Sequence, residues 1–213
     1  MTRKELFYKL YEKLSEIYEN PHCSLDYKSP FELLVATILS AQCTDIRVNI
    51  VTTEMFKKWN TPEQFARLTE KELAKEIMST GFYKNKSKNI VNCSKKIMSD
   101  FNGQVPANME ELLTLDGVGR KTASVILGEV FGKPAIVIDT HAKRLANRMG
   151  LTKESDPVKI EFDLAKFIPK KYQFEFCHML VHHGRAYCKA PTPNCSDCPL
   201  NEICPRKGVV QST

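Results

Sequence analysis

The chain has 213 residues, 42% of them hydrophobic and 26% charged, which is the composition of a globular protein with one domain or two small ones. Its longest apolar run, Leu33 to Leu39, is far shorter than a membrane span, and its first residues lack the apolar core of a secretory signal, so we expect a cytoplasmic protein. The formal net charge of +6 permits a polyanionic partner without requiring one.

Helical periodicity runs along nearly the whole chain. The clearest helix start is Ser29-Pro30-Phe31-Glu32, which combines an N-cap serine, a proline at the first helical position and a capping-box glutamate. An apolar stripe then predicts a helix over 30–42. Because the best strand candidate, 136–138, is too short to anchor a sheet, the predicted class is all-α. Further helices are expected near 3–18, 46–59, 62–67, 70–79, 85–101, 109–115, 120–131, 140–149, 157–167 and 172–186.

Lysines crowd one stretch of the chain, at positions 84, 86, 88, 95 and 96. Such a run is either a solvated helix face or a surface for a polyanion, and the run alone does not separate the two interpretations. Further along, the only visible joint is Gly132-Lys133-Pro134, and we expect an unstructured tail after Pro205.

The stretch TLDGVGRKTAS, residues 114–124, predicts a hairpin of two helices with Gly117-Val118-Gly119 as its turn. A helix N-terminus opened by glycines presents free backbone N–H groups, which suit a phosphate. The alternative is a plain helical hairpin in which glycine serves only the turn. Arg120 and Lys121 favour the phosphate, because a cation in the first turn of a helix otherwise costs about 0.3–1 kcal/mol.

Lys121 is also a candidate nucleophile. An ordinary lysine has a pKa of about 10.4 and is almost fully protonated at neutral pH. Desolvation and nearby positive charge activate amine nucleophiles, and Arg120 and the helix N-terminus supply the charge. Downstream, Asp139 stands at the N-cap of the predicted helix 140–149, where a cap contributes about 0.5–2 kcal/mol. Hydrogen bonds from the helix terminus keep that carboxylate ionised, so it is also able to stabilise a positively charged sugar.

Four of the eight cysteines lie close together near the end of the chain, in the pattern C-x6-C-x2-C-x5-C. Four thiolates suit either a structural zinc ion or an iron–sulfur cluster. The spacing favours the cluster, because zinc ribbons usually pair two C-x2-C units. Disulfides fit poorly with a chain that lacks a secretory signal. We expect the scattered Cys23, Cys43, Cys93 and Cys177 to be reduced and structural.

Taken together, these segments closely resemble the endonuclease III family of DNA repair glycosylases. The matching stretches follow in order along nearly the whole chain: ILSAQCTD at 38–45, GFYKNKSKNI at 81–90, LDGVGRKTASVIL at 115–127, VIDTHAKR at 137–144, and HGRAYC with the cysteine pattern at 183–204.

The resemblance implies a two-lobed helix-hairpin-helix glycosylase fold. Residues 23–132 would form a six-helix lobe that contains the hairpin at about 108–131. Residues 1–22 with 133–213 would form an iron–sulfur cluster lobe. The implied function is a monomeric, bifunctional glycosylase and AP lyase of base excision repair, associated with the nucleoid through double-stranded DNA. It would remove oxidised pyrimidines and cut 3′ to the abasic site by β-elimination through a lysine Schiff base.

The resemblance also assigns roles to individual residues. Lys121 matches the nucleophile, Asp139 the catalytic carboxylate, and Gln42 and Phe82 the residues that fill the gap left by a flipped nucleotide and wedge into the opposite strand. The other implied DNA contacts are Lys84, Gly117, Gly119, Arg120 and His141. The implied ligands of a 4Fe–4S cluster are Cys188, Cys195, Cys198 and Cys204.

One departure from the family pattern is Asp116, which stands where the hairpin commonly has proline and places an acid beside the predicted phosphate site. The rival functions are an adenine-mismatch-type monofunctional glycosylase, a non-catalytic helix-hairpin-helix DNA-binding module and an iron–sulfur electron carrier. The first lacks the hairpin lysine and has a glutamate near position 36, where this chain has Ala36. Lys121 and Asp139 argue against the second rival, and the hairpin argues against the third.

Overall fold

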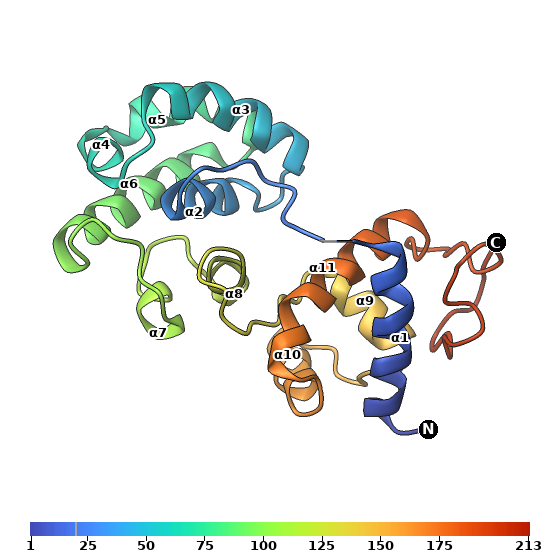
Figure 1. Ribbon diagram of the computed structural model, residues 1–213. Coiled ribbons are helices and arrows are strands. Elements are labelled where there is room, and N and C mark those ends of the chain that lie inside the picture. Colours follow the sequence, from blue (N-terminus) through green and yellow to red (C-terminus); the bar gives the residue numbers. More distant parts are fainter. Residues whose placement is uncertain (20) are drawn as a thin grey trace. The chain divides into compact units, whose positions relative to one another are not determined.

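The computed structural model describes residues 1–19 and 21–213. Within these ranges every regular element is helical, which confirms the predicted all-α class (Figure 1). Contacts between Cα atoms divide the chain into two compact units. One unit is Cys23–Lys133, and the other combines Met1–His22 with Pro134–Thr213.

The unit Cys23–Lys133 is built around two helices. The long α6 packs against α4, α5 and the 3₁₀ helix η1, while α2 packs against α3, α6 and α8. From Phe31 to Leu39, every side chain of α2 is buried, so this helix forms the core of the unit. The elements are α2 (Pro30–Leu39), α3 (Asp45–Lys58), α4 (Pro62–Arg67), α5 (Glu70–Glu76), η1 (Met78–Thr80), α6 (Tyr83–Asp100), α7 (Met109–Leu112) and α8 (Arg120–Glu129).

Local capping explains where most of these helices begin. The side chains of Ser29, Thr44, Thr61 and Thr69 each accept a hydrogen bond from an amide in the first turn of α2, α3, α4 and α5. Each such cap contributes roughly 1 kcal/mol. The caps lie at the start of helices that the sequence predicted within a residue or two.

The end of α2 corrects the predicted helix 30–42. The helix stops at Leu39, and Gln42 lies beyond it in a loop, with a φ of 54° in the left-handed region. A residue with a Cβ in that conformation cannot continue a right-handed helix. Gln42 is therefore a loop residue and not the last position of a helical stripe.

The second unit is formed by α1 (Arg3–Ile17), α9 (Thr140–Arg148), α10 (Pro157–Ala165) and α11 (Lys170–Ala186). Helix α11 packs against both α9 and α1. Phe7 of α1 and Phe176 of α11 are fully buried, and their rings meet edge to face with centroids 5.1 Å apart. Burial of two such rings joins the N-terminal helix to the C-terminal part of the chain.

The residues after Pro205 do not form the free tail that we expected. The amide of Lys207 donates to the carbonyl of Arg148 (2.8 Å), and the amide of Thr213 donates to the carbonyl of Pro193 (3.1 Å). The amide of Ser196 returns a bond to the Thr213 carbonyl (3.0 Å). These bonds hold the last residues against the cysteine-bearing loop.

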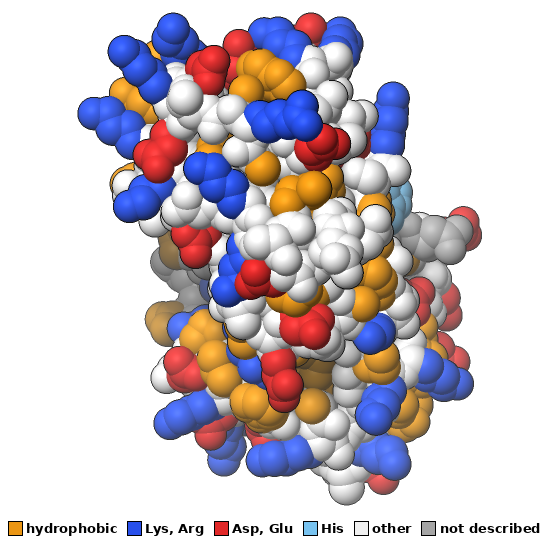
Figure 2. All heavy atoms as spheres, turned by 90° about the vertical axis from the view of Figure 1, so that its left-hand side faces the viewer, with side chains coloured by type: hydrophobic (Ala, Val, Ile, Leu, Met, Phe, Trp, Pro, Cys, Tyr) orange, Lys and Arg blue, Asp and Glu red, His pale blue; other side chains and the backbone are white. Residues whose placement is uncertain are grey.

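The face shown in Figure 2 carries basic and acidic side chains side by side, without one broad basic patch. None of the helices in the described ranges has the length and apolarity needed to cross a membrane.

Candidate active site and cysteine cavity

The glycine turn between α7 and α8 leaves the N-terminus of α8 open. Gly117 has a φ of +78°, and a Cβ there would lie 2.9 Å from the Cβ of Asn89, so only glycine lets the turn pass so close to α6. Gly119 is the N-cap of α8, no side chain caps this helix, and a Cβ on Gly119 would meet no atom within 4 Å. The first-turn amides of a helix have no partner inside the helix, so an anion can approach these amides directly.

Arg120 and Lys121 are the first two residues of α8, and the first turn holds no acidic residue. The Lys121 side chain is exposed, and Arg120 is half-exposed. Asp116, the departure from the family pattern, turns its carboxylate to α6, where Oδ2 accepts a hydrogen bond from the side-chain amide of Asn92 (2.9 Å). That bond gives the carboxylate a partner of its own beside the hairpin.

Gln42 and Phe82 form two exposed tips in the same unit. Phe82 is 63% exposed, and Gln42 is also exposed. Both residues have left-handed backbone, with φ of 54° at Gln42 and 48° at Phe82. Only two other non-glycine residues in the described ranges, Asn102 and Arg206, share that conformation. Strained backbone of this kind is concentrated at functional sites.

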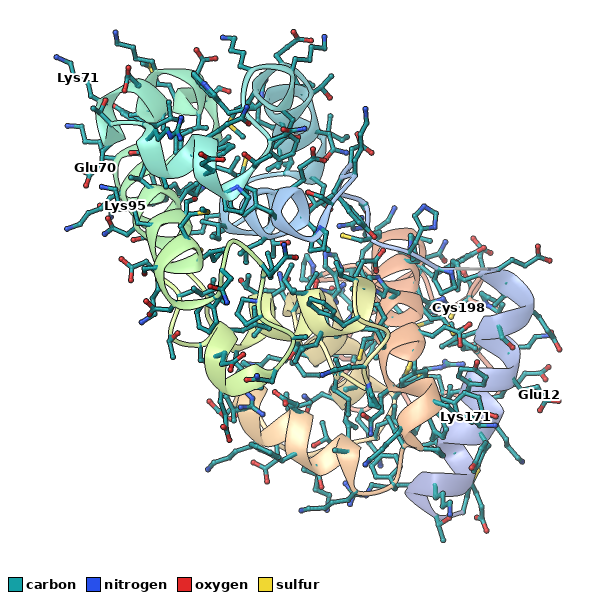
Figure 3. The ribbon with its side chains drawn as sticks, turned by 60° about the vertical axis from the view of Figure 1, so that its left-hand side comes forward. Glu12, Glu70, Lys71, Lys95, Lys171 and Cys198 are labelled. Atoms are coloured by element: carbon teal, nitrogen blue, oxygen red, sulfur yellow. The ribbon has the colours of Figure 1, made fainter. Side chains whose placement is uncertain are left out.

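Lys84 lies in the first turn of α6 and is exposed. Together with Lys71, Lys75 and Tyr83 it lines an open cleft beside α5. Lys71 of α5 and Lys95 of α6 both extend away from their helices (Figure 3). Lys86 differs from these lysines, because its side chain is only 5% exposed. The lysine run is thus only partly a solvated face.

In the other unit, Asp139 is the N-cap of α9, as predicted for its structural role. Its Oδ1 accepts a hydrogen bond from the amide of Ala142 (2.7 Å), and the side chain is half-buried. The preceding segment, residues 135–138, is buried and positions the cap. One carboxylate oxygen is therefore fixed by the helix, and the orientation of the second follows from it.

His141 stands in the first turn of the same helix. Burial lowers the pKa of the imidazole; Asp139 opposes this shift, whereas Arg144 and Arg185 add to it. The net shift of the pKa favours the neutral form of the imidazole. Its Nδ1 lies 3.1 Å from Nη2 of Arg144.

Gly184 of α11 allows α9 to come close. A Cβ at this position would lie 2.9 Å from Nδ1 of His141 and 3.1 Å from Nη2 of Arg144. Arg144 uses the close approach: its Nη2 donates to the Gly184 carbonyl (3.2 Å) and its Nε to the Cys188 carbonyl (3.0 Å). The helix that begins at Asp139 is thereby connected to the first cysteine of the C-terminal pattern.

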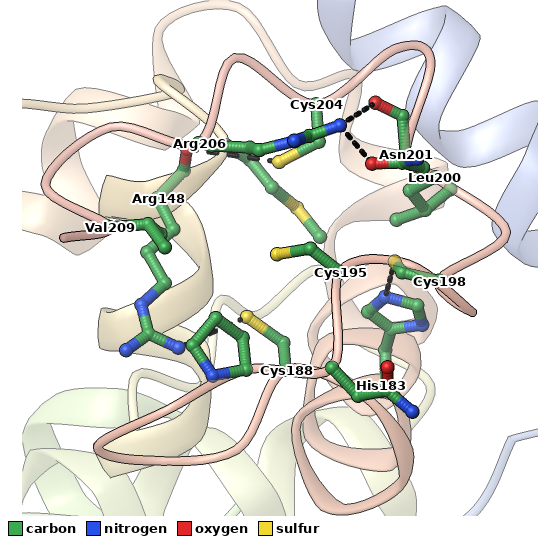
Figure 4. A pocket seen from close by; sticks show the side chains of 13 residues that line it. Arg148, His183, Cys188, Cys195, Cys198, Leu200, Asn201, Cys204, Arg206 and Val209 are labelled. Carbon is green, nitrogen blue, oxygen red and sulfur yellow. Dashed lines mark hydrogen bonds between the residues drawn. The ribbon is translucent and has the colours of Figure 1, made fainter. Parts of the chain in front are cut away.

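The structure brings the four predicted cysteines to one cavity (Figure 4). All four thiols are free. Burial raises the pKa of the Cys198 and Cys204 thiols, and the neighbouring cysteines raise it further. No group of three or more His, Cys, Asp or Glu side chains in the described part of the chain is arranged to hold a metal ion.

Two side chains that the sequence analysis missed contact these sulfurs. Nη1 of Arg148 donates to Sγ of Cys188 (3.4 Å) and to the carbonyl of Lys189 (2.8 Å). Nε2 of the buried His183 lies 3.3 Å from Sγ of Cys198. The sequence does hold one indication of Arg148: it follows Arg144 by four residues, which places both arginines on one face of α9.

Comparisons with known proteins bear on this arrangement. A family model described as HhH-GPD superfamily base excision DNA repair protein matches residues 35–170. Endonuclease III of Synechocystis sp. is 50% identical over 193 residues, which cover 90% of this chain and 88% of the relative. Endonuclease III of Bacillus subtilis is 43% identical over 194 residues, covering 91% and 89%.

Two solved structures agree in fold over nearly the full chain. One is a trapped endonuclease III–DNA covalent intermediate in an estranged-adenine complex, and the other is a non-covalent endonuclease III–DNA complex. Each is 39% identical, superposes with a TM-score of 0.91, and is matched over 97% of both chains.

Proposed function

The chain belongs to the endonuclease III family, within the HhH-GPD superfamily of base excision DNA repair proteins, and from this membership we propose how its own residues divide the chemistry. It is a bifunctional DNA glycosylase and AP lyase. The observation that carries the residue assignment is the exposed lysine in the first turn of an uncapped helix that glycines open.

We propose that the substrate is double-stranded DNA containing an oxidised pyrimidine or an abasic site. Two similar solved structures are complexes of their proteins with DNA. In this chain, the open N-terminus of α8 would receive a backbone phosphate, with Gly117 and Gly119 permitting the approach and Arg120 adding charge. Because the visible surface charge is mixed, binding should depend on such local contacts more than on one basic face (Figure 2).

We propose that Lys121 is the nucleophile of both steps. Its amine attacks C1′ of the damaged nucleotide, and the base leaves with the electrons of the glycosidic bond and takes up a proton. The resulting amine–sugar adduct opens to a Schiff base. Loss of a proton from C2′ then expels the 3′ phosphate by β-elimination, and hydrolysis of the imine returns the lysine. The exposure of Lys121 supports this role, because the amine is accessible to a macromolecular substrate.

Asp139 is the proposed carboxylate that stabilises positive charge developing on the sugar. Its cap to Ala142 supports the role, because a carboxylate with one oxygen held by a helix keeps its direction during the reaction. We assign His141, in the same turn, and Lys84 to contacts with the DNA backbone.

Gln42 and Phe82 are proposed to engage the duplex where the nucleotide is extruded. Chemistry on a base within a duplex requires extrusion, and the vacated space must be filled. Their exposure and their left-handed backbone support the proposal, because exposed tips held in a disfavoured conformation serve no packing purpose.

A 4Fe–4S cluster is the proposed occupant of the cysteine cavity. Four free thiols around one space match the ligand set of such a cluster, and Arg148 and His183 would donate hydrogen bonds to two of the sulfurs. When bound, the group would supply four covalent ties across the C-terminal loop. Cys188, Cys195, Cys198 and Cys204 would hold it.

Borohydride trapping tests the assignment of the nucleophile. Reduction during turnover on an abasic duplex should join wild-type protein covalently to DNA, whereas Lys121→Gln should give no adduct and still bind the same duplex. Arg120→Gln is the matched control, which should trap more slowly but at Lys121. An adduct formed by Lys121→Gln at another residue would overturn the assignment.

A further inference from the structure

Lys86 is a buried cation on a helix whose other lysines are exposed or half-exposed. Its side chain is 5% exposed, while Lys84, Lys88 and Lys95 of α6 all reach solvent. The ammonium donates to two backbone carbonyls, those of Leu39 and Thr80, each at 2.8 Å. Burying a charge costs free energy unless hydrogen bonds satisfy it. These two bonds offset that cost and hold the side chain in its buried position.

The two carbonyls lie next to the two exposed tips. Leu39 is the last residue of α2, three positions before Gln42, and Thr80 is the last residue of η1, two positions before Phe82. The backbone amide of Lys86 also donates to the carbonyl of Phe82 (3.0 Å). Lys86 therefore binds the backbone just before Gln42, the backbone just before Phe82, and the carbonyl of Phe82 itself.

In the described part of the chain, the backbone bond from the amide of Cys43 to the carbonyl of Ser40 (3.1 Å) closes the turn that carries Gln42, and the bonds of Lys86 add to it on both sides. Left-handed backbone is disfavoured for any residue with a Cβ and persists only where the surroundings enforce it. Phe82 is the N-cap of α6 without a side-chain cap bond, and it is 63% exposed, so packing contributes little there. The end of α2 likewise leaves its last carbonyls without partners inside the helix, and the ammonium occupies that of Leu39.

We propose that Lys86 is a positioning residue for base extrusion, whose ammonium ties the loop of Gln42 to the loop of Phe82 and so sets the spacing between the two tips. The proposal rests on the proposed roles of Gln42 and Phe82. Lys86 itself touches no substrate. Its effect should appear in the discrimination of lesion from intact duplex, and not in non-specific binding or in the chemistry of the amine.

The test compares Lys86→Met, which keeps the length of the side chain and removes its donors, with Lys71→Met, an exposed lysine of α5. Affinity is measured by fluorescence anisotropy for a duplex with an abasic analogue and for the same duplex undamaged. Lys86→Met should lower the lesion-to-intact ratio by about tenfold, given the strength of hydrogen bonds to charged groups. Lys71→Met should leave the ratio unchanged. Borohydride trapping on a single-stranded abasic oligonucleotide, where no partner strand is displaced, should stay within about twofold of wild type for both variants.

A double-mutant cycle separates positioning from general stability. In a Gln42→Ala, Phe82→Ala background, adding Lys86→Met should change the ratio by less than about twofold, because the tips through which Lys86 acts are gone. The same tenfold loss in both backgrounds would overturn the positioning role. A wild-type ratio in the Gln42→Ala, Phe82→Ala protein itself would instead overturn the proposed function of the tips.

Two further variants keep the outcome interpretable. Lys86→Arg retains charged donors and should restore most of the ratio that Lys86→Met loses. Should Lys86→Met fail to fold, Lys86→Gln takes its place, because its amide is shorter, is uncharged and has two N–H groups where the ammonium has three. The lesion-to-intact ratio of Lys86→Gln should then lie below those of wild type and Lys86→Arg. Equal ratios for Lys86→Arg and for the donor-poor variant would count against the tie.

Discussion

Replacing Gly184 with alanine should strain the contact between α9 and α11. The new Cβ would lie 2.9 Å from Nδ1 of His141 and 3.1 Å from both the Cβ of His141 and Nη2 of Arg144. Cβ atoms do not tolerate a contact below 3.0 Å, so the helices must separate or the side chains must move. Such overpacking costs about 1–3 kcal/mol. Alanine recovers up to about 1 kcal/mol over glycine inside a helix, which leaves a net loss of roughly 1–2 kcal/mol.

Chemical denaturation of the purified protein measures this loss. The double variant Gly184→Ala, His141→Ala should regain part of it, because the imidazole is the nearest obstacle, although the Cβ of residue 141 remains. Single-turnover excision should also slow in Gly184→Ala, because α9 begins at Asp139. A Gly184→Ala protein more stable than wild type by the helix-propensity difference alone would refute the packing argument.

Three other predictions concern the same unit. Asp139→Asn can still cap α9, so its stability should stay near wild type while the excision rate falls by about 10²–10³, whereas Asp139→Ala should in addition lose about 0.5–2 kcal/mol of unfolding free energy. Metal analysis of protein prepared without air should find iron, and Cys195→Ser should lose iron and thermal stability while Cys23→Ser retains both; zinc without iron would contradict the cluster. Burial alone would raise the pKa of Asp163, but hydrogen bonds from Arg3 and Thr152 outweigh it and lower that pKa. The carboxylate then stabilises the fold above its unfolded pKa of about 3.9 and loses this effect as the pH falls through the folded value, so Asp163→Asn should be destabilising at pH 7 and nearly neutral at acidic pH.

Helices and their starts were predictable because their causes are local. The N-cap of α2 depends on Ser29 and its amide partner three residues on, and the cap of α9 depends on Asp139 and Ala142 in the same way. Apolar periodicity supplied the rest of the all-α assignment. The four cysteines were recognisable as a group because their short spacing confines them to one loop region, which the structure shows around one cavity.

Features that depend on distant partners were not predictable. Lys86 belongs to a run of lysines in the sequence, yet it is buried by a bond to the carbonyl of Leu39, 47 residues away. The tail after Pro205 is held by the carbonyls of Arg148 and Pro193, which no local pattern indicates. The predicted end of α2, at residue 42, was also wrong. The helical pattern of the sequence continues to Gln42, although the helix ends at Leu39 and the backbone turns at Gln42.

The places where local rules fail are also the places to which function was assigned. Two cations occupy the first turn of α8, where the helix dipole disfavours them and no side chain supplies a cap. Gln42 and Phe82 adopt a backbone conformation that their side chains disfavour. Natural sequences are otherwise locally consistent, and each violation must be offset elsewhere in the fold. For the cations the offset that we propose is a ligand, a backbone phosphate of the bound DNA. For the tips it lies inside the protein, in the ammonium of Lys86, so their geometry is set before any DNA arrives. The hairpin should therefore gain stability on binding intact or damaged DNA, while the tips contribute only where a nucleotide can leave the stack.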